Sequence, residues 1–292
     1  MHHDAFTPVL PLRCALGESP VWDDAAGILS FVDILGRCLH LYRPDDGTVR
    51  SLGLPEHVGC AVPLAGGGHV AGLRTGIFRL GPDATSTGLL AVNPTDPADT
   101  RFNDGRVDPS GHLVIGSIDE PKSGSRGALY RLEKTGLRLL FGGLLTSNGL
   151  AFSPDGRTLY HADTPRFAVH AYDYDPDSGA VAGKRLFAQL DPSASDRGRP
   201  DGAAVDEDGC YWTALFAGGR VQRYDPDGRL MAEYRLPARC PTMPCFGGPD
   251  RRTLYVTSVG AGLDGPLDGA LFAMPVDVAG LPSPPCNPES LP

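Results

Sequence analysis

The chain has 292 residues, of which 41% are hydrophobic and 21% are charged, as in an ordinary globular protein. Its net charge of −9 excludes the basic face that phosphate binding requires, so no nucleic-acid partner is expected. No stretch approaches the ~18 apolar residues of a membrane span. The first residues do not resemble a secretory signal, and the seven cysteines contain no CxxC pair, so we expect a reduced, cytoplasmic protein that does not contact a membrane.

Taken in chain order, one unit recurs six times: an apolar residue, a turn rich in Asp, Pro and Gly, and a strand of β-branched or aromatic residues. The copies begin at Val21, Val62, Val107, Phe152, Val205 and Gly247. Their spacing of roughly 41 to 53 residues is that of a four-stranded propeller blade. Further short hairpins follow several copies, and no window of about 11 residues has a helical period. The sequence therefore predicts an all-β fold, a six-bladed β-propeller that forms a single domain over residues 1–292.

The two ends of the chain carry separate expectations. The segment 6–12 is expected to supply a strand to the last blade and so close the ring, because an open sheet edge invites aggregation. The ordered core is expected to span about 5–280. The proline-rich tail beyond Gly280 is expected to be poorly ordered.

Four metal-capable side chains share one position ahead of a turn glycine. Asn103, Asn148 and Asp201 each precede that glycine by eight residues, and Glu18, ahead of a longer turn, precedes it by nine. Equivalent positions in a propeller start the innermost strands and converge on one axis. Asn, Asp and Gly also mark ordinary loops, which is the competing interpretation. However, the chain holds only four Asn, two of them in this register, and Cys60 and Pro244 take the position in the other copies. A functional site is favoured.

The chemistry of this set points to a cation. Glu18, Asn148 and Asp201 offer two carboxylates and an amide, an oxygen set that suits Ca²⁺, Mg²⁺ or Mn²⁺, with Zn²⁺ and Fe²⁺ as further options. Three protein ligands leave open positions for water and substrate, as catalytic ions require. No EF-hand loop and no G-x-S-x-G elbow is complete.

Five segments, in the expected order, resemble the SMP-30/gluconolactonase/regucalcin family. They are LGESPVW (16–22), RFNDGRVDP (101–109), SNGLAF (147–152), RPDG (199–202) and CFGGP (245–249). The resemblance extends over about 14–280 and looks closest to bacterial sugar lactonases of the xylono- or arabinolactonase kind. It implies a six-bladed propeller with one divalent cation at the top of its channel.

The resemblance also implies roles for single residues. Glu18, Asn148 and Asp201 would hold the metal, and Arg101 and Asn103 would contact substrate. The family's further acidic contact falls in Gly116–Pro121, where the sequence departs from the family pattern. Glu120 is the residue assigned to it, with Asp119 as the alternative.

The resulting hypothesis is hydrolysis of a sugar lactone to its aldonic acid. The cation would polarise the lactone carbonyl, and Asp201 would act as general base. Three other readings stay open: an organophosphate or aryl-ester hydrolase that uses the same metal site, a non-catalytic calcium-binding regulatory protein of the regucalcin kind, and an interaction propeller. The expected partner is a small-molecule sugar lactone, and the expected state is a monomer or a small homo-oligomer.

Overall fold

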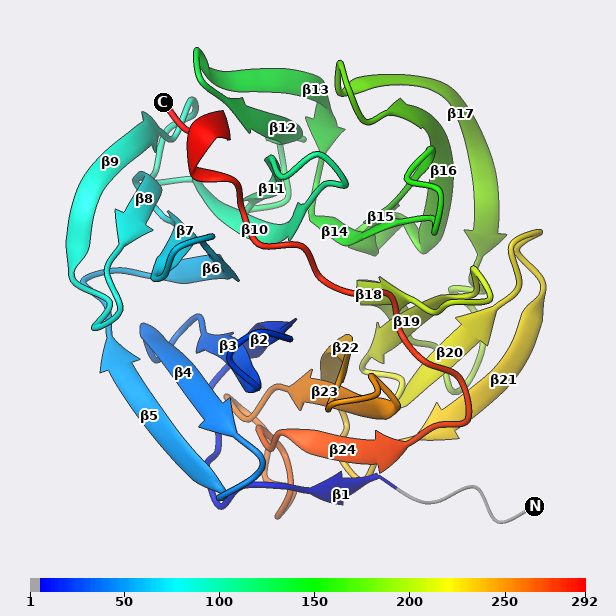
Figure 1. Ribbon diagram of the computed structural model, residues 1–292. Helices are drawn as coiled ribbons and strands as arrows, with labels where there is room; N and C mark the ends of the chain where they lie inside the picture. Colours follow the sequence, from blue (N-terminus) through cyan, green and yellow to red (C-terminus); the bar gives the residue numbers. More distant parts are fainter. Residues whose placement is uncertain (1–5) are drawn as a thin grey trace.

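The computed structural model describes residues 6–292, which form six four-stranded antiparallel sheets arranged around a central channel (Figure 1). This confirms the predicted six-bladed β-propeller. Within each of the first five blades the strands follow chain order from the innermost strand outwards. Helical structure in residues 6–292 is confined to two 3₁₀ turns, η1 (Thr164–Arg166) and η2 (Pro288–Ser290). Neither is long or apolar enough to cross a membrane.

The bounds of the strands are as follows. Blade 1 contains β2 (Gly17–Asp23), β3 (Ile28–Asp33), β4 (Cys38–Arg43) and β5 (Thr48–Gly53). Blade 2 contains β6 (Val58–Pro63), β7 (His69–Leu73), β8 (Gly76–Leu80) and β9 (Ser86–Val92). Blade 3 contains β10 (Thr100–Val107), β11 (Leu113–Asp119), β12 (Gly127–Glu133) and β13 (Gly136–Leu144). Blade 4 contains β14 (Ser147–Phe152), β15 (Thr158–Asp163), β16 (Ala168–Asp175) and β17 (Ala180–Gln189). Blade 5 contains β18 (Arg199–Val205), β19 (Tyr211–Phe216), β20 (Arg220–Tyr224) and β21 (Leu230–Arg235). Blade 6 contains β22 (Pro241–Gly247), β23 (Thr253–Ser258), β24 (Phe272–Pro275) and β1 (Thr7–Pro8).

The N-terminal segment closes the ring, as the sequence predicts. Strand β1 pairs with β24 so that Thr7 lies opposite Ala273, and it becomes the outer strand of the last blade (Figure 1). Phe6, next to this strand, is buried and belongs to the apolar cluster between blades 5 and 6. Residues from both ends of the chain therefore build one blade, which ties the ring shut without a covalent bond.

The six innermost strands line the channel and run in the same direction. Each contacts the next around the ring, and β22 returns to β2. Every one of them has a break in its pairing register near its start. Such β-bulges bend a strand and re-aim its side chains. At the bulge of β2, Ser19 lies at φ +48° in the left-handed region, which is uncommon for a residue other than glycine.

The C-terminal tail differs from the expectation of poor order. Residues 281–291 cross the end of the channel where the inner strands finish (Figure 1). Leu281 N donates to Val205 O, Cys286 N donates to Pro63 O, and Asn287 N donates to Gly111 O. Cys286 and Leu291 are buried in the core cluster of blades 2 and 3. Proline removes backbone donors but does not prevent a segment from packing, and here apolar side chains hold the tail in place.

Candidate active site

The four side chains of the shared register lie at the bulges of four inner strands. Glu18 is in β2, Asn103 in β10, Asn148 in β14 and Asp201 in β18, and all four are buried. The position assigned to Pro244 by counting is wrong, because Pro244 pairs with Val256 beyond the bulge. Thr242 and Met243 occupy the bulge of β22 instead.

Hydrogen bonds connect three of these side chains in one chain of contacts. Asn103 Nδ2 donates to Asn148 Oδ1 at 2.7 Å, and Asn148 Nδ2 donates to Asp201 Oδ1 at 2.6 Å. Thr164 in η1 supports the centre of this chain, since its Oγ1 accepts from Asn148 Nδ2 at 2.8 Å and donates to Pro200 O. The fold thus brings Asn103 into contact with Asn148, 45 positions away in the sequence, and Asn148 into contact with Asp201, 53 positions away.

Glu18 joins this group through its charge. Its Oε2 accepts from the backbone N of Ser19 at 2.9 Å. Burial and the charge of Asp104 raise the pKa of Glu18 to about 8. Burial, followed by the charges of Glu18 and Asp104, holds the pKa of Asp201 well above its usual range. The protein therefore places carboxylates close together in a buried site without enough positive charge to balance them.

Asp104 adds to this negative charge. It follows Asn103 in the same bulge, and its Oδ2 accepts from Leu150 N at 2.9 Å. Its Oδ1 is buried and has no hydrogen-bond partner. Buried polar atoms in folded proteins almost always have a partner. The orphan oxygen therefore marks this end of the channel as a place built for a further group.

The residues present fit a divalent cation. No three His, Cys, Asp or Glu side chains of residues 6–292 are grouped in a way that could hold a metal. The donor set is instead the two carboxylates of Glu18 and Asp201 together with the amide of Asn148. A cation would oppose the burial and the repulsion that raise both pKa values, because an opposite charge favours the ionised carboxylate. All three donors are oxygens, which hard cations prefer.

Arg101 and Glu120 lie beside this group. Arg101 Nη1 donates to Asn103 Oδ1 at 2.7 Å, and its Nε donates to Glu120 Oε1 at 3.2 Å. Its Nη2 donates to no residue among 6–292 and is free for a ligand. Asp119, the alternative to Glu120, faces another way: it accepts from Gly124 N and Arg126 in the β11–β12 turn. The structure thus brings Glu120 to the site and keeps Asp119 out of it.

Arg74 orients Glu120 from the neighbouring blade. Its Nη1 and Nη2 lie 2.8 and 2.9 Å from the two Glu120 oxygens, a bidentate pair of fixed geometry. Nη2 also lies 3.1 Å from Nδ1 of His57. His161, in β15 of blade 4, is fully buried with its Nε2 2.9 Å from Ser147 Oγ and belongs to the core.

Arg106 closes the channel beneath the carboxylates. Its guanidinium donates to Ala203 O at 2.6 Å, to Pro20 O at 3.3 Å and to Pro244 O at 3.4 Å, and so connects β10 to three other inner strands. Burial raises the pKa of Glu18 to about 8 and that of Asp104 to about 6, and the charge of Arg106 opposes both shifts in part.

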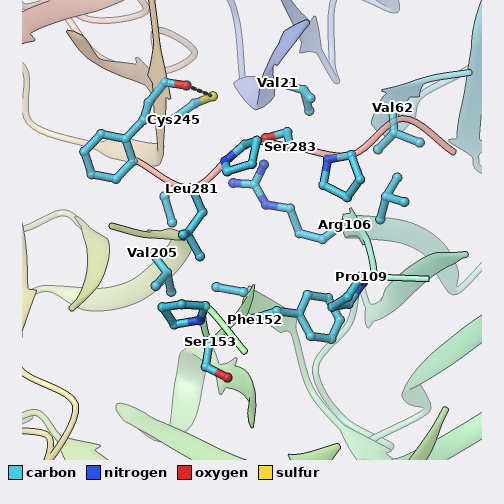
Figure 2. A pocket seen from close by; sticks show the side chains of 17 residues that line it. Val21, Val62, Arg106, Pro109, Phe152, Ser153, Val205, Cys245, Leu281 and Ser283 are labelled. Carbon is cyan, nitrogen blue, oxygen red and sulfur yellow. Dashed lines mark hydrogen bonds between the residues drawn. The ribbon is translucent and has the colours of Figure 1, made fainter. Parts of the chain in front are cut away.

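A cavity of about 320 Å³ lies on the other side of this arginine, under the C-terminal tail. Figure 2 shows Arg106 among apolar side chains of the inner strands, with Leu281 and Ser283 of the tail beside it. The carboxylates lie at the starts of the inner strands, whereas this cavity lies at their ends. The two regions are therefore distinct, and the cavity is not part of the candidate active site.

Sequence reasoning did not identify Asp104, Arg106 or Arg74. Asp104 carried a signal, since it directly follows Asn103. Arg106 is three residues further along the same strand, but its direction depends on the bulge. Arg74 and Glu120 are 46 residues apart in the sequence and meet only where blades 2 and 3 pack together, so no local pattern reveals their contact.

These features define a class: a six-bladed propeller with a buried oxygen-donor site at one end of its channel. Residues 16–260 match the family model described as SMP-30/Gluconolactonase/LRE-like region, and the chain belongs to this family. It is 43% identical to a 6-deoxy-6-sulfogluconolactonase of Pseudomonas putida over 276 residues, 92% of this chain and 94% of the relative. It is 35% identical to regucalcin of Oryctolagus cuniculus, over 88% of this chain and 87% of that protein.

Solved structures agree with this assignment. The calcium-binding protein regucalcin from Agrobacterium tumefaciens superposes with a TM-score of 0.91 at 30% identity, over 97% of both chains. A gluconolactonase of Xanthomonas campestris superposes with a TM-score of 0.76 at 25% identity, over 92% of this chain and 89% of the other. The resemblance read from the five sequence segments is thereby confirmed, and it includes relatives that are named as lactonases.

Proposed function

We propose that this protein is a metal-dependent hydrolase that opens a sugar lactone to its aldonic acid. The observation that carries the proposal is the meeting of the buried carboxyl groups of Glu18 and Asp201 with the Asn148 amide, next to an arginine with a free guanidinium nitrogen. The names of the lactonase relatives support the same reaction class.

Glu18, Asn148 and Asp201 would hold one divalent cation, and Ca²⁺, Zn²⁺, Mn²⁺, Mg²⁺ and Fe²⁺ are the candidates. When bound, it would supply Lewis-acid polarisation of the lactone carbonyl. The Asn148 amide oxygen accepts one hydrogen bond, from Asn103, and keeps its second lone pair for binding the cation. Asn103 and Thr164 fix the orientation of that amide from opposite sides.

Asp201 is the proposed general base. Its carboxylate is held in place by Asn148, so it can take a proton from a water that attacks the carbonyl carbon. The same carboxyl can return the proton to the ring oxygen as the ester C–O bond breaks, which leaves a carboxylic acid and a free hydroxyl. No other proton carrier is needed for the overall addition of water.

Arg101, Asn103 and Glu120 are the proposed substrate contacts. Arg101 is buried and fixed by three partners, Glu120, Asn103 and the backbone O of Phe102, so its free Nη2 can donate to a sugar oxygen with little loss of side-chain freedom. Glu120 keeps acceptor capacity beyond its bonds to the two arginines, since a carboxylate has about four acceptor sites. Together they offer donors and acceptors for a polyhydroxylated ring.

The test is a pH-stat assay on a panel of aldonolactones, with chelator and after addition of each cation. We expect acid release that is lost in chelator and restored by at least one cation. Calcium binding in calorimetry without acid release from any lactone would contradict the proposal. That outcome would favour a non-catalytic calcium-binding protein, the alternative suggested by the relatives named regucalcin.

A further inference from the structure

The rim of the site next to blade 2 carries basic side chains, whereas the centre of the site carries carboxyl groups. Blade 2 supplies no residue to the group of Glu18, Asn148 and Asp201. It supplies His57 and Arg74, which lie just before β6 and just after β7 and extend the ladder between these strands, with Arg74 N donating to His57 O at 3.0 Å. Arg37, exposed in the β3–β4 turn of blade 1, is held next to the segment that leads into β6, since its backbone O accepts from Leu54 N at 2.7 Å, three residues before His57.

Positive charge exceeds negative charge on this rim. The charges of Arg74, Arg101 and Arg37 act on His57, and the charge of Glu120 opposes them. Arg74 and Arg101 are both paired with Glu120. Arg37, by contrast, makes no side-chain hydrogen bond or ion pair with residues 6–292. Glu56, next to His57, accepts from Thr75 N and Oγ1 at 2.9 and 2.6 Å and keeps its negative charge, so three arginines face two carboxylates on this rim.

His57 is held as a neutral hydrogen-bond donor. Arg74 Nη2 can only donate, so Nδ1 of His57 must accept, and the ring proton is then on Nε2. Burial, together with the charges of Arg74, Arg101 and Arg37, lowers the pKa of His57 and keeps the ring neutral. Nε2 donates to no residue among 6–292, and the side chain is only half-buried. The N–H is thus available to a ligand.

We propose that Arg37 and His57 form a subsite for an anionic, tetrahedral group, such as a sulfonate, on the lactone carbon remote from the carbonyl. This assignment rests on the proposed function, since it names the part of the substrate that the rim would bind. Arg37 supplies the charge and His57 the directed N–H, while Arg101 and Asn103 bind the ring between this subsite and the carboxylates. The sulfonated sugar in the name of the Pseudomonas putida relative has a group of this kind.

The experiment compares three lactones: 6-deoxy-6-sulfo-D-gluconolactone, 6-phospho-D-gluconolactone and D-gluconolactone. The quantity measured is the anion preference, the kcat/KM for each charged lactone divided by that for D-gluconolactone. Arg37→Gln and His57→Leu should each lower this preference about fivefold or more, the range expected when a charge-assisted hydrogen bond is lost. His57→Gln, which keeps an N–H donor, should retain more of it than His57→Leu. The charged lactone with the larger preference in the wild type identifies the group that the subsite takes.

A matched control is Arg199→Gln. Arg199 is exposed at the same end of the channel in blade 5, where its guanidinium lies 5.8 Å from the centre of the Phe167 ring. This variant removes the same charge but should keep the anion preference. A preference unchanged in Arg37→Gln and His57→Leu, or lowered equally in Arg199→Gln, would overturn the proposal.

A binding measurement separates this proposal from the proposed function. If the wild type hydrolyses none of the three lactones, the lactonase function fails. Calorimetric titration with 6-deoxy-6-sulfogluconate and with gluconate still tests the subsite. Tighter binding of the sulfonate that weakens in Arg37→Gln supports it, whereas equal binding of both acids overturns it.

Discussion

Replacing Glu18 by Gln should stabilise the metal-free protein above neutral pH. The pKa of Glu18 is raised from 4.5 to about 8 in the folded protein. Between these values the native state binds a proton that the unfolded state has lost, so the free energy of unfolding falls as pH rises. The stability contribution of this carboxyl is complete below pH 4.5 and is lost as pH passes through 8. Gln cannot ionise, so the variant lacks the part of this loss that Glu18 causes, while Asp201, whose pKa is also raised, still titrates.

The magnitude follows from the size of the pKa shift. A shift of about 3.5 pH units at about 1.4 kcal/mol each corresponds to roughly 5 kcal/mol over the whole range, and to roughly 1 kcal/mol between pH 7 and pH 8. The range from pH 7 to pH 8 is the one in which the effect of Glu18 is best measured. His69 and His161 have pKa values lowered to about 4 and about 3, and their opposite effect on stability is confined to pH values below about 6.5.

The assay is urea unfolding in chelator at several pH values from 7 to 8. It compares the wild type, Glu18→Gln and, as a control, Asp227→Asn in the exposed β20–β21 turn. Wild type and control should lose stability with rising pH, and Glu18→Gln should show a flatter profile. Adding Ca²⁺ should remove the slope of the wild type, because a bound cation lowers the carboxyl pKa. A wild-type stability that is constant or rises between pH 7 and pH 8 in chelator would refute the reasoning.

Four further outcomes are expected. Asp201→Asn should reduce kcat on a cleaved lactone by about 10²-fold or more, the usual worth of a general base, and retention of most of kcat would reject that role. Arg101→Ala should mainly raise KM, and a large loss of kcat at constant KM would instead assign it to the transition state. Phe6→Ala should cost about 3–5 kcal/mol in urea unfolding, because it removes a buried ring from the closing blade. Truncation after Gly280 should lower the melting temperature by several degrees, and an unchanged value would mean that the packed tail adds nothing to stability.

Much of this fold could be predicted because each blade repeats the same local signals. The Asp-Pro-Gly turns and the β-branched strands fix hairpins locally, and six copies leave few ways to bury their apolar faces other than a ring. The tail was mispredicted for the opposite reason. It has no repeat partner, and only its three-dimensional contacts, such as those of Cys286 with Pro63, give it a place.

The candidate site likewise contains some residues that a local sequence pattern reveals and others that only the three-dimensional contacts reveal. Glu18, Asn103, Asn148 and Asp201 could be found because a fixed distance to a turn glycine is a local property. Pro244 was assigned the position wrongly because Arg251, at φ +53°, takes the place of the turn glycine in this blade, so the count lacks its usual origin. Arg74, which orients Glu120 across a blade boundary, has no counterpart in any local pattern.

Arg106 shows how far one bulge determines the chemistry of this site. Asn103, Asp104 and Arg106 are neighbours in one strand, and a regular strand would send Asp104 and Arg106 to the same face. The bulge between Phe102 and Gly105 breaks that alternation. Asn103 then joins Asn148, the orphan oxygen of Asp104 remains buried, and Arg106 turns beneath both to the carbonyls of three other blades. Its guanidinium donates to backbone carbonyls and only partly offsets the rise that burial causes in the pKa values of Glu18 and Asp104, so the site keeps carboxyl groups that no residue neutralises.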